Sequence, residues 1–317
     1  MAKILVTGAA GFIGSHTADC LLGEGHAVVG VDNFRTGRRE NLAAALRSAA
    51  FALHELDVAE PGALDKLVAA EKPATIIHLA ALVSVQESIA NPALNFSLNV
   101  AASQLVAEAA RVHGVGRVVF ASSAAIYGDA AERPIRESAE KLPVSPYGAA
   151  KLASEALLLG HGATYGFTVR CQRYFNVFGP RQDPSSPYSG VISIFARSYR
   201  EGKSVVIFGD GRQTRDFIAV KDVARANVLA ATRPGVTSGV ANICTGRATS
   251  LLDLAALFAS HHPGSPAPTH RPARTGDIVH SLGDPAAATA ALGFTAQATV
   301  AEGLHELING PAVPALS

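Results

Sequence analysis

The stretch Lys3-Ile-Leu-Val-Thr-Gly-Ala-Ala-Gly-Phe-Ile-Gly14 decides the fold of this chain. Its apolar residues, Ile4 to Val6, predict a short buried strand. Gly8, Gly11 and Gly14 follow, and a helical pattern begins among them. Glycines without side chains permit a tight turn, close approach of the backbone to a pyrophosphate, and close packing of helix on strand. The free N–H groups at the start of a helix favour negative phosphates. The stretch therefore predicts a dinucleotide-binding turn.

A carboxylate after the next apolar run indicates which dinucleotide binds. Asp32 ends the run Ala27 to Val31 and comes 18 residues after Gly14. At about this spacing a carboxylate accepts hydrogen bonds from the adenosine ribose, and it would repel a 2′-phosphate. We therefore expect NAD rather than NADP. A glycine triplet alone is a weak signal, but the strand, the helix and Asp32 together make it specific.

Composition excludes several classes of protein. The 317 residues are 48% hydrophobic and 17% charged, with a net charge of +1. This balance is typical of a globular enzyme and gives no basic excess for nucleic acid or an anionic membrane. No apolar run is long enough to span a bilayer, and we expect no signal peptide. Cys20, Cys171 and Cys244 are isolated, which predicts reduced thiols and a cytoplasmic location. The His and Cys spacing predicts no metal site.

Apolar runs alternate with helical patterns along the chain. Strands are expected at 3–7, 27–31, 51–56, 74–79, 117–122, 167–174 and 239–244. Helices are expected at 12–24, 38–48, 61–71, 93–113 and 147–162. This alternation predicts an α/β fold, a Rossmann-type doubly wound parallel sheet with a smaller C-terminal α/β substrate domain. We assign residues 1–176 and about 216–246 to the dinucleotide-binding domain, and about 177–215 and 247–317 to the other.

Tyr147 and Lys151 stand four residues apart, on one face of a predicted helix. A nearby cation and the positive nicotinamide ring would lower the pKa of the Tyr147 phenol from about 10 toward neutrality. The phenolate could then take a proton from a hydroxyl while hydride leaves the same carbon. Alone, the pair is more often a surface feature of a helix, but here it follows a dinucleotide fingerprint.

Ser123 ends the strand expected at 117–122, and the carboxyl ends of parallel strands are where ligands bind in this fold. It is therefore a candidate to hydrogen-bond a reacting hydroxyl, although Ser122 and Ser123 could equally cap a turn.

Weaker signals surround the expected cofactor. Asp57 and Val58 follow the third strand, where Asp57 either holds the adenine edge or caps a turn. His78 precedes Leu79, Ala80 and Ala81, whose small alanines would let a cofactor approach, and we interpret His78 itself as structural. Asn99 lies in an apolar helix, where an unpaired amide is costly, so we expect it to bond the loop that holds the cofactor.

Arg215 and Arg274 are candidate phosphate clamps, because the planar guanidinium donates two hydrogen bonds at once. From spacing alone, each is more often an ordinary surface arginine.

Taken together, the motifs resemble the extended short-chain dehydrogenase/reductases, specifically the UDP-glucose (UDP-galactose, UDP-N-acetylglucosamine) 4-epimerase family. The motifs are Thr-Gly-Ala-Ala-Gly-Phe-Ile-Gly (7–14), His-Leu-Ala-Ala (78–81), Ser122-Ser123, Tyr147-x-x-x-Lys151, Arg-Tyr-Phe-Asn-Val-Phe-Gly-Pro-Arg (173–181), Gly209 to Phe217, and Arg-Thr-Gly-Asp (274–277). The resemblance spans about residues 3–300.

The resemblance implies NAD-dependent 4-epimerisation through a transient 4-keto sugar. Tyr147 would act as base toward the 4-hydroxyl, Lys151 would hold the nicotinamide ribose, and Ser123 would assist the proton transfer. The implied cofactor site comprises Gly8, Gly11, Phe12, Ile13, Gly14, Asp32, Asn33, Asp57, Val58, Leu79, Ala80, Ala81, Asn99, Tyr147 and Lys151. The implied substrate site comprises Ser123, Asn176, Arg215, Arg274, Asp277 and Ser281. The family also implies a homodimer, formed through the helices near 93–113 and 147–162.

One departure separates this chain from related sugar dehydratases and decarboxylases. Those enzymes need an acid near the active serine, whereas residues 123–128 read Ser-Ala-Ala-Ile-Tyr-Gly. Removal of water requires a general acid and base, so we reject dehydration.

The position seven residues after Arg274 is Ser281. In the resembled family a bulky residue there goes with plain hexoses and a small one with 2-acetamido sugars. We expect UDP-N-acetylglucosamine to be accepted beside UDP-glucose, unless the Ser281 side chain faces backbone.

Other functions stay open at this stage. The chain could be a nucleotide-sugar oxidoreductase whose cofactor exchanges, an epimerase of a dTDP-sugar, or a silent dinucleotide sensor.

Overall fold

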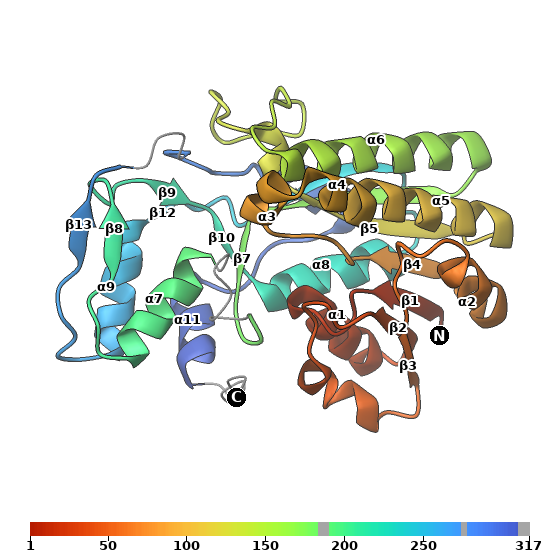
Figure 1. Ribbon diagram of the computed structural model, residues 1–317, viewed down its shortest axis with the longest axis horizontal. Helices are drawn as coiled ribbons and strands as arrows, with labels where there is room; N and C mark the ends of the chain where they lie inside the picture. Colours follow the sequence, from red (N-terminus) through yellow and green to blue (C-terminus); the bar gives the residue numbers. More distant parts are fainter. Residues whose placement is uncertain (183–189, 274–277, 310–317) are drawn as a thin grey trace.

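A computed structural model describes residues 1–182, 190–273 and 278–309. Its centre is a seven-stranded parallel sheet in the order β11-β6-β5-β4-β1-β2-β3 (Figure 1). The strands are β1 (Lys3–Thr7), β2 (Ala27–Asp32), β3 (Phe51–Glu55), β4 (Thr75–His78), β5 (Arg117–Ser123), β6 (Thr168–Tyr174) and β11 (Gly239–Ile243). This order reverses direction between β1 and β4, and such a switch point leaves a crevice for a ligand.

Helices cover both faces of the sheet. The helices here are α1 (Phe12–Gly23), α2 (Ala63–Glu71), α5 (Ala102–His113), α6 (Pro146–Tyr165) and α8 (Val220–Thr232). One apolar cluster joins α1 and α8 to the sheet through residues such as Leu21, Val119 and Val223. A second joins α2, α5 and α6 through residues such as Val106 and Leu158. These two layers confirm the predicted doubly wound fold.

The segment 38–48 corrects the prediction of one helix. It forms two 3₁₀ helices, η1 (Arg39–Leu42) and η2 (Ala45–Arg47). Leu42 and Ala45 are buried three residues apart, a spacing that suits the three-residue turn of a 3₁₀ helix. Asn41 Nδ2 also donates to Ala10 O at 2.8 Å, so contacts with the glycine turn determine the local conformation.

The helix predicted at 93–113 is interrupted. It consists of α4 (Pro92–Asn95), a π-helix η3 (Phe96–Ala101) and α5. Asn99 lies in the π-helix, and its side chain bonds both Leu82 and Asn95, one turn earlier in the same helix. Single wide turns of this kind occur often at functional sites. The helix ends at Gly114, which caps α5 in the left-handed conformation.

Shorter elements gather at the other end of the molecule, on the left of Figure 1. Three two-stranded sheets pair β7 (Asn176–Phe178) with β10 (Phe217–Ala219), β9 (Thr214–Arg215) with β12 (Thr249–Ser250), and β8 (Val206–Phe208) with β13 (Thr269–Arg271). The helices at this end are α7 (Val191–Arg200), α9 (Leu251–His261) and α11 (Val300–Asn309), whereas α10 (Ala286–Leu292) packs against β11 and α8 beside the central sheet. α7, α9 and α11 share an apolar cluster that includes Phe195, Phe258 and Leu304.

Two short elements complete the layout near the sheet, α3 (Val85–Ala90) and η4 (Ala124–Tyr127). Among the residues described, no helix is both long and apolar enough to cross a membrane.

Candidate active site

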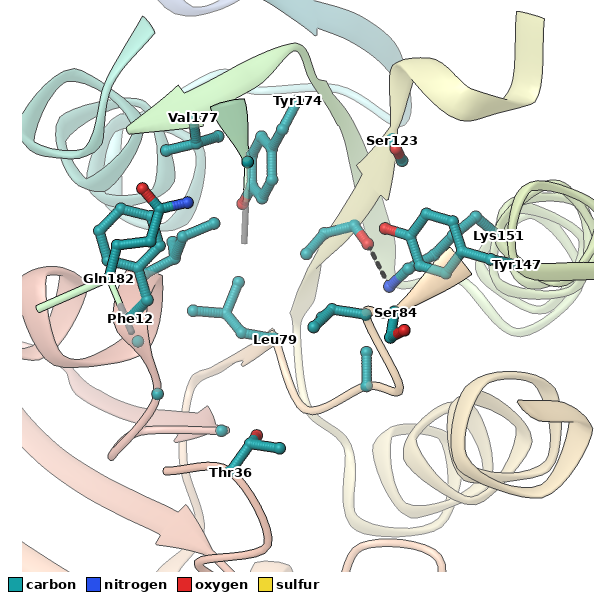
Figure 2. Close-up of a pocket in the computed structure, with 18 of the residues that line it drawn as sticks. Phe12, Thr36, Leu79, Ser84, Ser123, Tyr147, Lys151, Tyr174, Val177 and Gln182 are labelled. Carbon is teal, nitrogen blue, oxygen red and sulfur yellow. Dashed lines mark hydrogen bonds between the residues drawn. The ribbon is translucent and has the colours of Figure 1, made fainter. Parts of the chain in front are cut away.

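A cavity of about 1150 Å³ opens at the carboxyl ends of the parallel strands (Figure 2). Its lining comes from the glycine turn, the ends of β2, β4 and β5, helix α6, and the segments 174–182, 190–192 and 278–281. A pocket for one small ligand usually has a volume of about 300–1,000 Å³. This cavity therefore has room for two ligands side by side.

The glycine turn forms a cradle for a phosphate. Gly8 has φ +68°, and a Cβ there would lie 2.8 Å from Ala80 N. A Cβ on Gly14 would lie 2.0 Å from Gly8 O, so neither position accepts a side chain. Gly11 precedes α1 without a side-chain cap, which leaves backbone N–H groups directed into the cavity beside Phe12 and Ile13. The residues present fit a dinucleotide pyrophosphate.

Asp32 lies beside this cradle and is 7% exposed. Its carboxylate accepts hydrogen bonds from Ala10 N and Phe34 N, both at 2.8 Å, one on each oxygen. Burial raises the pKa of this carboxyl, and the backbone hydrogen bonds oppose the shift. Each oxygen keeps acceptor capacity toward the cavity, as the binding of a ribose requires.

Asn33 and Asp57 join at the same end of the cavity, where Asn33 Nδ2 donates to Asp57 Oδ2 at 3.0 Å. Asp57 also accepts from Ala59 N at 2.8 Å, so it caps a turn as well as lining the cavity beside Val58.

The segment after β4 forms another wall, made of Leu79, Ala80 and Ala81. Thr7 Oγ1 accepts hydrogen bonds from Leu79 N and Ala80 N at 3.1 and 3.2 Å. The Asn99 side chain also bonds this loop. Its Oδ1 accepts from Leu82 N at 3.1 Å, and its Nδ2 donates to Leu82 O at 3.0 Å. This confirms that Asn99 bonds the loop, but Asn99 itself does not line the cavity.

His78 is the structural residue that the sequence indicated. Its Nδ1 lies 2.8 Å from Thr7 Oγ1, and its Nε2 lies 3.3 Å from Ser103 Oγ. Burial, and then the charge of Lys151, lowers the pKa of His78 to about 3. The imidazole therefore stays neutral and bridges the glycine turn to α5.

The low pKa of His78 predicts a loss of stability in mild acid. Between pH 6.5 and 3 only the unfolded chain binds this proton, so the free energy of unfolding falls as the pH decreases below about 6.5. The slope approaches about 1.4 kcal/mol per pH unit. Urea unfolding of the parent and of His78→Asn at pH 7, 6 and 5 measures it. The variant should be less stable at pH 7 but lack this component, and an equal slope in both proteins would contradict the assignment.

Tyr147, Lys151 and Ser123 converge at the opposite wall of the cavity (Figure 2). The N-terminus of α6 is capped by Ser145, whose Oγ accepts from Gly148 N at 3.1 Å, and this fixes Tyr147 in the first turn. Lys151 Nζ lies 5.9 Å from the centre of the Tyr147 ring. It donates to Ala121 O at 2.8 Å, which is the dashed line in Figure 2. Ser123 caps η4 by accepting from Ala125 N, so both functions considered for it are compatible with its position.

Burial shifts the pKa values of both Tyr147 and Lys151 when no cofactor is bound. Burial raises the pKa of the Tyr147 phenol, and a hydrogen bond with Ser123 opposes the rise. Burial also lowers the pKa of Lys151 to about 7, which weakens it as a source of positive charge at neutral pH. Lys151 by itself therefore does not bring the pKa of Tyr147 below that of a free phenol. The expected lowering of the pKa of Tyr147 therefore depends on the positive nicotinamide ring.

The other half of the cavity contains the predicted substrate residues Asn176, Arg215 and Ser281. Arg215 Nη1 donates to Thr214 O at 2.9 Å and to Val279 O at 3.3 Å, which holds the guanidinium at the rim. Ser281 N donates to Thr214 O at 3.1 Å, so its side chain extends from a strand-like segment that β9 fixes. Arg274 and Asp277 lie outside the described residues.

Several lining residues were not predicted. Tyr174 and Gln182 border the cavity opposite Tyr147, and Arg35, Glu87 and His280 also line it. Tyr174 belongs to the Arg-Tyr-Phe-Asn motif at the end of β6, so its place at a strand end was a usable signal. Arg35 and Glu87 are brought together only by the tertiary fold.

A parallel sheet with a glycine cradle, a ribose carboxylate and a Tyr–Lys–Ser group defines a dinucleotide-dependent enzyme that acts on a hydroxyl group. The model of the NAD dependent epimerase/dehydratase family matches residues 4–244. The chain belongs to this family.

The similarity to individual members extends over nearly the whole chain. A UDP-glucose 4-epimerase of Mycolicibacterium smegmatis is 39% identical over 308 residues, 97% of each chain. A UDP-N-acetylglucosamine 4-epimerase of Methanobrevibacter ruminantium, solved with UDP-N-acetylmuramic acid, superposes with a TM-score of 0.91 at 35% identity and 97% coverage of both chains. The UDP-glucose 4-epimerase of Thermus thermophilus, solved with NAD, gives a TM-score of 0.87 at 33% identity, covering 97% of this chain and 98% of that one.

Proposed function

We propose that the chain is a nucleotide-sugar 4-epimerase that retains NAD and acts on UDP-hexoses. The observation that carries the proposal is the single cavity of about 1150 Å³, which has the dinucleotide cradle on one side, Arg215 and Ser281 on another, and Tyr147 with Ser123 between them. One cavity of this form holds a sugar nucleotide against a nicotinamide. A retained cofactor can then take hydride and return it within one binding event.

The residues have distinct roles in this proposal. NAD, held by the glycine cradle and Asp32, would supply a hydride acceptor for C4 of the sugar and a positive charge. A positive charge near Tyr147 would lower the pKa of its phenol, which burial alone raises. The phenolate removes the proton of the 4-hydroxyl while Ser123 hydrogen-bonds the same oxygen, and a 4-keto sugar results. The 4-keto sugar would then rotate within the cavity. Tyr147 would return the proton to the 4-oxygen while hydride is added to the other face of C4.

The positions of the carboxylates support epimerisation over dehydration. Among the residues described, the carboxylates that line the cavity are Asp32, Asp57 and Glu87. Asp32 ends β2, Asp57 follows β3 and Glu87 lies in α3, so all three border the dinucleotide half of the cavity. The segment 123–128 contributes no acid. Elimination of water from the sugar therefore lacks a suitably placed general acid and base.

The second enzyme hypothesis, a nucleotide-sugar oxidoreductase with exchanging cofactor, differs in redox balance. A 4-epimerase neither consumes nor produces NADH over a cycle. Absorbance in the NADH band is therefore expected to stay constant while UDP-hexose is converted without added reductant. Stoichiometric formation or loss of NADH with turnover would support the oxidoreductase instead.

Ser281 is proposed to leave room for a 2-acetamido group, so that UDP-N-acetylglucosamine is a substrate beside UDP-glucose. Its side chain is small, and its position beside Arg215 at the cavity supports this assignment. Ser281→Tyr is expected to lower kcat/KM for the acetamido sugar about 10- to 100-fold relative to UDP-glucose. Both substrates should be assayed with parent and variant, and Ser281→Ala serves as the control that keeps the volume small. An unchanged ratio in Ser281→Tyr would remove Ser281 from the sugar pocket.

The nucleotide is proposed to be uridine diphosphate, and dTDP-sugars are the alternative. Competition by UDP and dTDP for the cavity distinguishes them. Uridine diphosphate should inhibit at the lower concentration, and the reverse order would favour a dTDP-sugar epimerase.

A homodimer is proposed through α5 and α6, which pack side by side (Figure 1). The two charged residues of α6, Lys151 and Glu155, are both buried. Its exposed positions are uncharged, namely Ala149, Ala153, Ala156, Gly160, Ala163, Thr164 and Tyr165. A solvent-facing helix usually has charged residues on that side, so this face suits contact with a second copy.

Sedimentation velocity tests the dimer. The parent is expected to sediment as a dimer and Ala156→Glu as a monomer, because the new carboxylate would be buried without a partner. Ala44→Glu, at an exposed position on the far side of the glycine turn, is the control and should stay dimeric. A monomeric parent would refute the interface.

A further inference from the structure

An ion pair joins two segments that border the dinucleotide half of the cavity. Arg35 Nη2 lies 2.5 Å from Glu87 Oε1, and both residues line the cavity. Arg35 is in the loop that follows Asp32, whereas Glu87 is in α3, beyond the wall formed after β4. Figure 2 shows Thr36 and Ser84, close neighbours of the pair in the sequence, on these two separate segments.

Each segment is fixed to its own part of the fold. On one side, Arg35 N donates to Asn33 Oδ1 at 3.1 Å, and Asn33 in turn bonds Asp57. On the other side, Ser84 Oγ accepts from Glu87 N at 2.9 Å and caps α3. The buried Ser88 accepts from Tyr147 N at 3.1 Å, which ties α3 to the catalytic helix α6. The Arg35–Glu87 pair thus connects two separately anchored walls.

A dinucleotide that reaches from Asp32 to Tyr147 must lie between these two walls. The glycine cradle is at its middle, and the loop after Asp32 and α3 flank it. A dinucleotide that leaves on this side of the cavity passes between the loop and α3. The ion pair spans that gap.

We propose that Arg35 and Glu87 form a clasp across the bound dinucleotide, and that opening of the clasp limits the rate at which the cofactor is released. This inference rests on the proposed function, because an epimerase must keep its cofactor through both hydride transfers. The side chains are 35% and 28% exposed, so the pair is screened by salt and contributes modestly. The clasp therefore acts on residence time rather than on the chemical step.

A competing arrangement would place Arg35 on a cofactor phosphate, with Glu87 as a repulsive neighbour. The two arrangements predict opposite effects for Glu87. Its neutralisation speeds release if Glu87 holds the clasp, and it slows release if Glu87 only repels the phosphate.

The test follows the release of NADH from loaded protein by its fluorescence, after a chase with excess NAD. At low salt, Arg35→Gln and Glu87→Gln are each expected to raise the dissociation rate about two- to fivefold. The charge-swapped double variant Arg35→Glu/Glu87→Arg should restore the parental rate. At 1 M salt, where the Debye length is about 3 Å, the difference between parent and single variants should largely disappear. Glu108→Gln breaks the exposed Arg111–Glu108 pair outside the cavity and serves as the matched control with unchanged release.

The outcomes distinguish a failure of the clasp from a failure of the proposed function. Release that is equal in parent and both single variants, slower release in Glu87→Gln, or a swap that fails to restore the rate would each overturn the clasp. If the parent itself loses its cofactor during gel filtration, the retained-cofactor function fails whatever the variants do.

Discussion

Tyr147→Phe is expected to lower kcat for 4-epimerisation by about 10²- to 10⁴-fold, the range that one positioned acid–base group contributes. In the proposed function the phenol exchanges a proton with the sugar, and it has Ser123 as a hydrogen-bond partner at the cavity. The ring of phenylalanine fills the same space, so the first turn of α6 and its cap at Ser145 should remain intact. Binding of the cofactor should therefore persist, since the cradle and Asp32 are untouched.

The measurement pairs steady-state turnover with the content of bound NAD after gel filtration. Tyr165→Phe is the matched control, because Tyr165 lies at the other end of α6 and is 53% exposed. That variant should keep parental turnover. A Tyr147→Phe protein that turns over within tenfold of the parent would show that another group is the base.

Arg173→Met is expected to lower the free energy of unfolding by about 3–5 kcal/mol, the cost of breaking a buried ion pair from one side. Arg173 and Glu155 have side chains only 4% and 3% exposed. Their two hydrogen bonds, 2.9 and 2.8 Å long, make the pair bidentate. Arg173 Nη1 also donates to Tyr127 Oη at 2.8 Å. Methionine would leave the Glu155 carboxylate buried without its cation.

Urea unfolding at pH 7 measures this effect. Arg111→Met removes the exposed Arg111–Glu108 pair and is the control, with an expected change below about 1 kcal/mol. The double variant Arg173→Met/Glu155→Leu should recover part of the loss, because it removes the unpaired charge as well. A loss below about 1 kcal/mol in Arg173→Met would mean that the pair is far less desolvated than the structure indicates.

Local sequence signals were sufficient for most of the fold. Each predicted strand ends within one or two residues of its observed place. Short runs rich in apolar residues, separated by turn residues, were a sufficient signal for the strands of this parallel sheet. The segment 38–48 was predicted wrongly, since its two 3₁₀ helices depend on contacts of Asn41 and Leu42 with the glycine turn. The π-helix at Asn99 has the same origin, because the amide bonds Leu82 across the fold.

In the site too, local motifs predicted some features, whereas others depend on tertiary contacts. Strand ends and glycine spacing bring Gly8, Asp32, Ser123 and Tyr147 to one cavity, and the motifs alone were enough to group them. The pKa of Tyr147 was beyond sequence reasoning, because burial depends on every element that packs around α6. The Arg35–Glu87 pair was also beyond it, since the two residues are 52 positions apart and belong to no shared motif.

Proton NMR of the purified protein mixed with UDP-glucose, without added cofactor, tests the central claim most directly. The anomeric signal of UDP-galactose should appear and grow to a constant ratio with that of UDP-glucose, because in the proposed function the protein carries its own NAD and returns every hydride. A parallel sample with UDP-N-acetylglucosamine should form the corresponding galacto epimer. If neither sugar changes, even after NAD is supplied, the chain is not a UDP-hexose 4-epimerase.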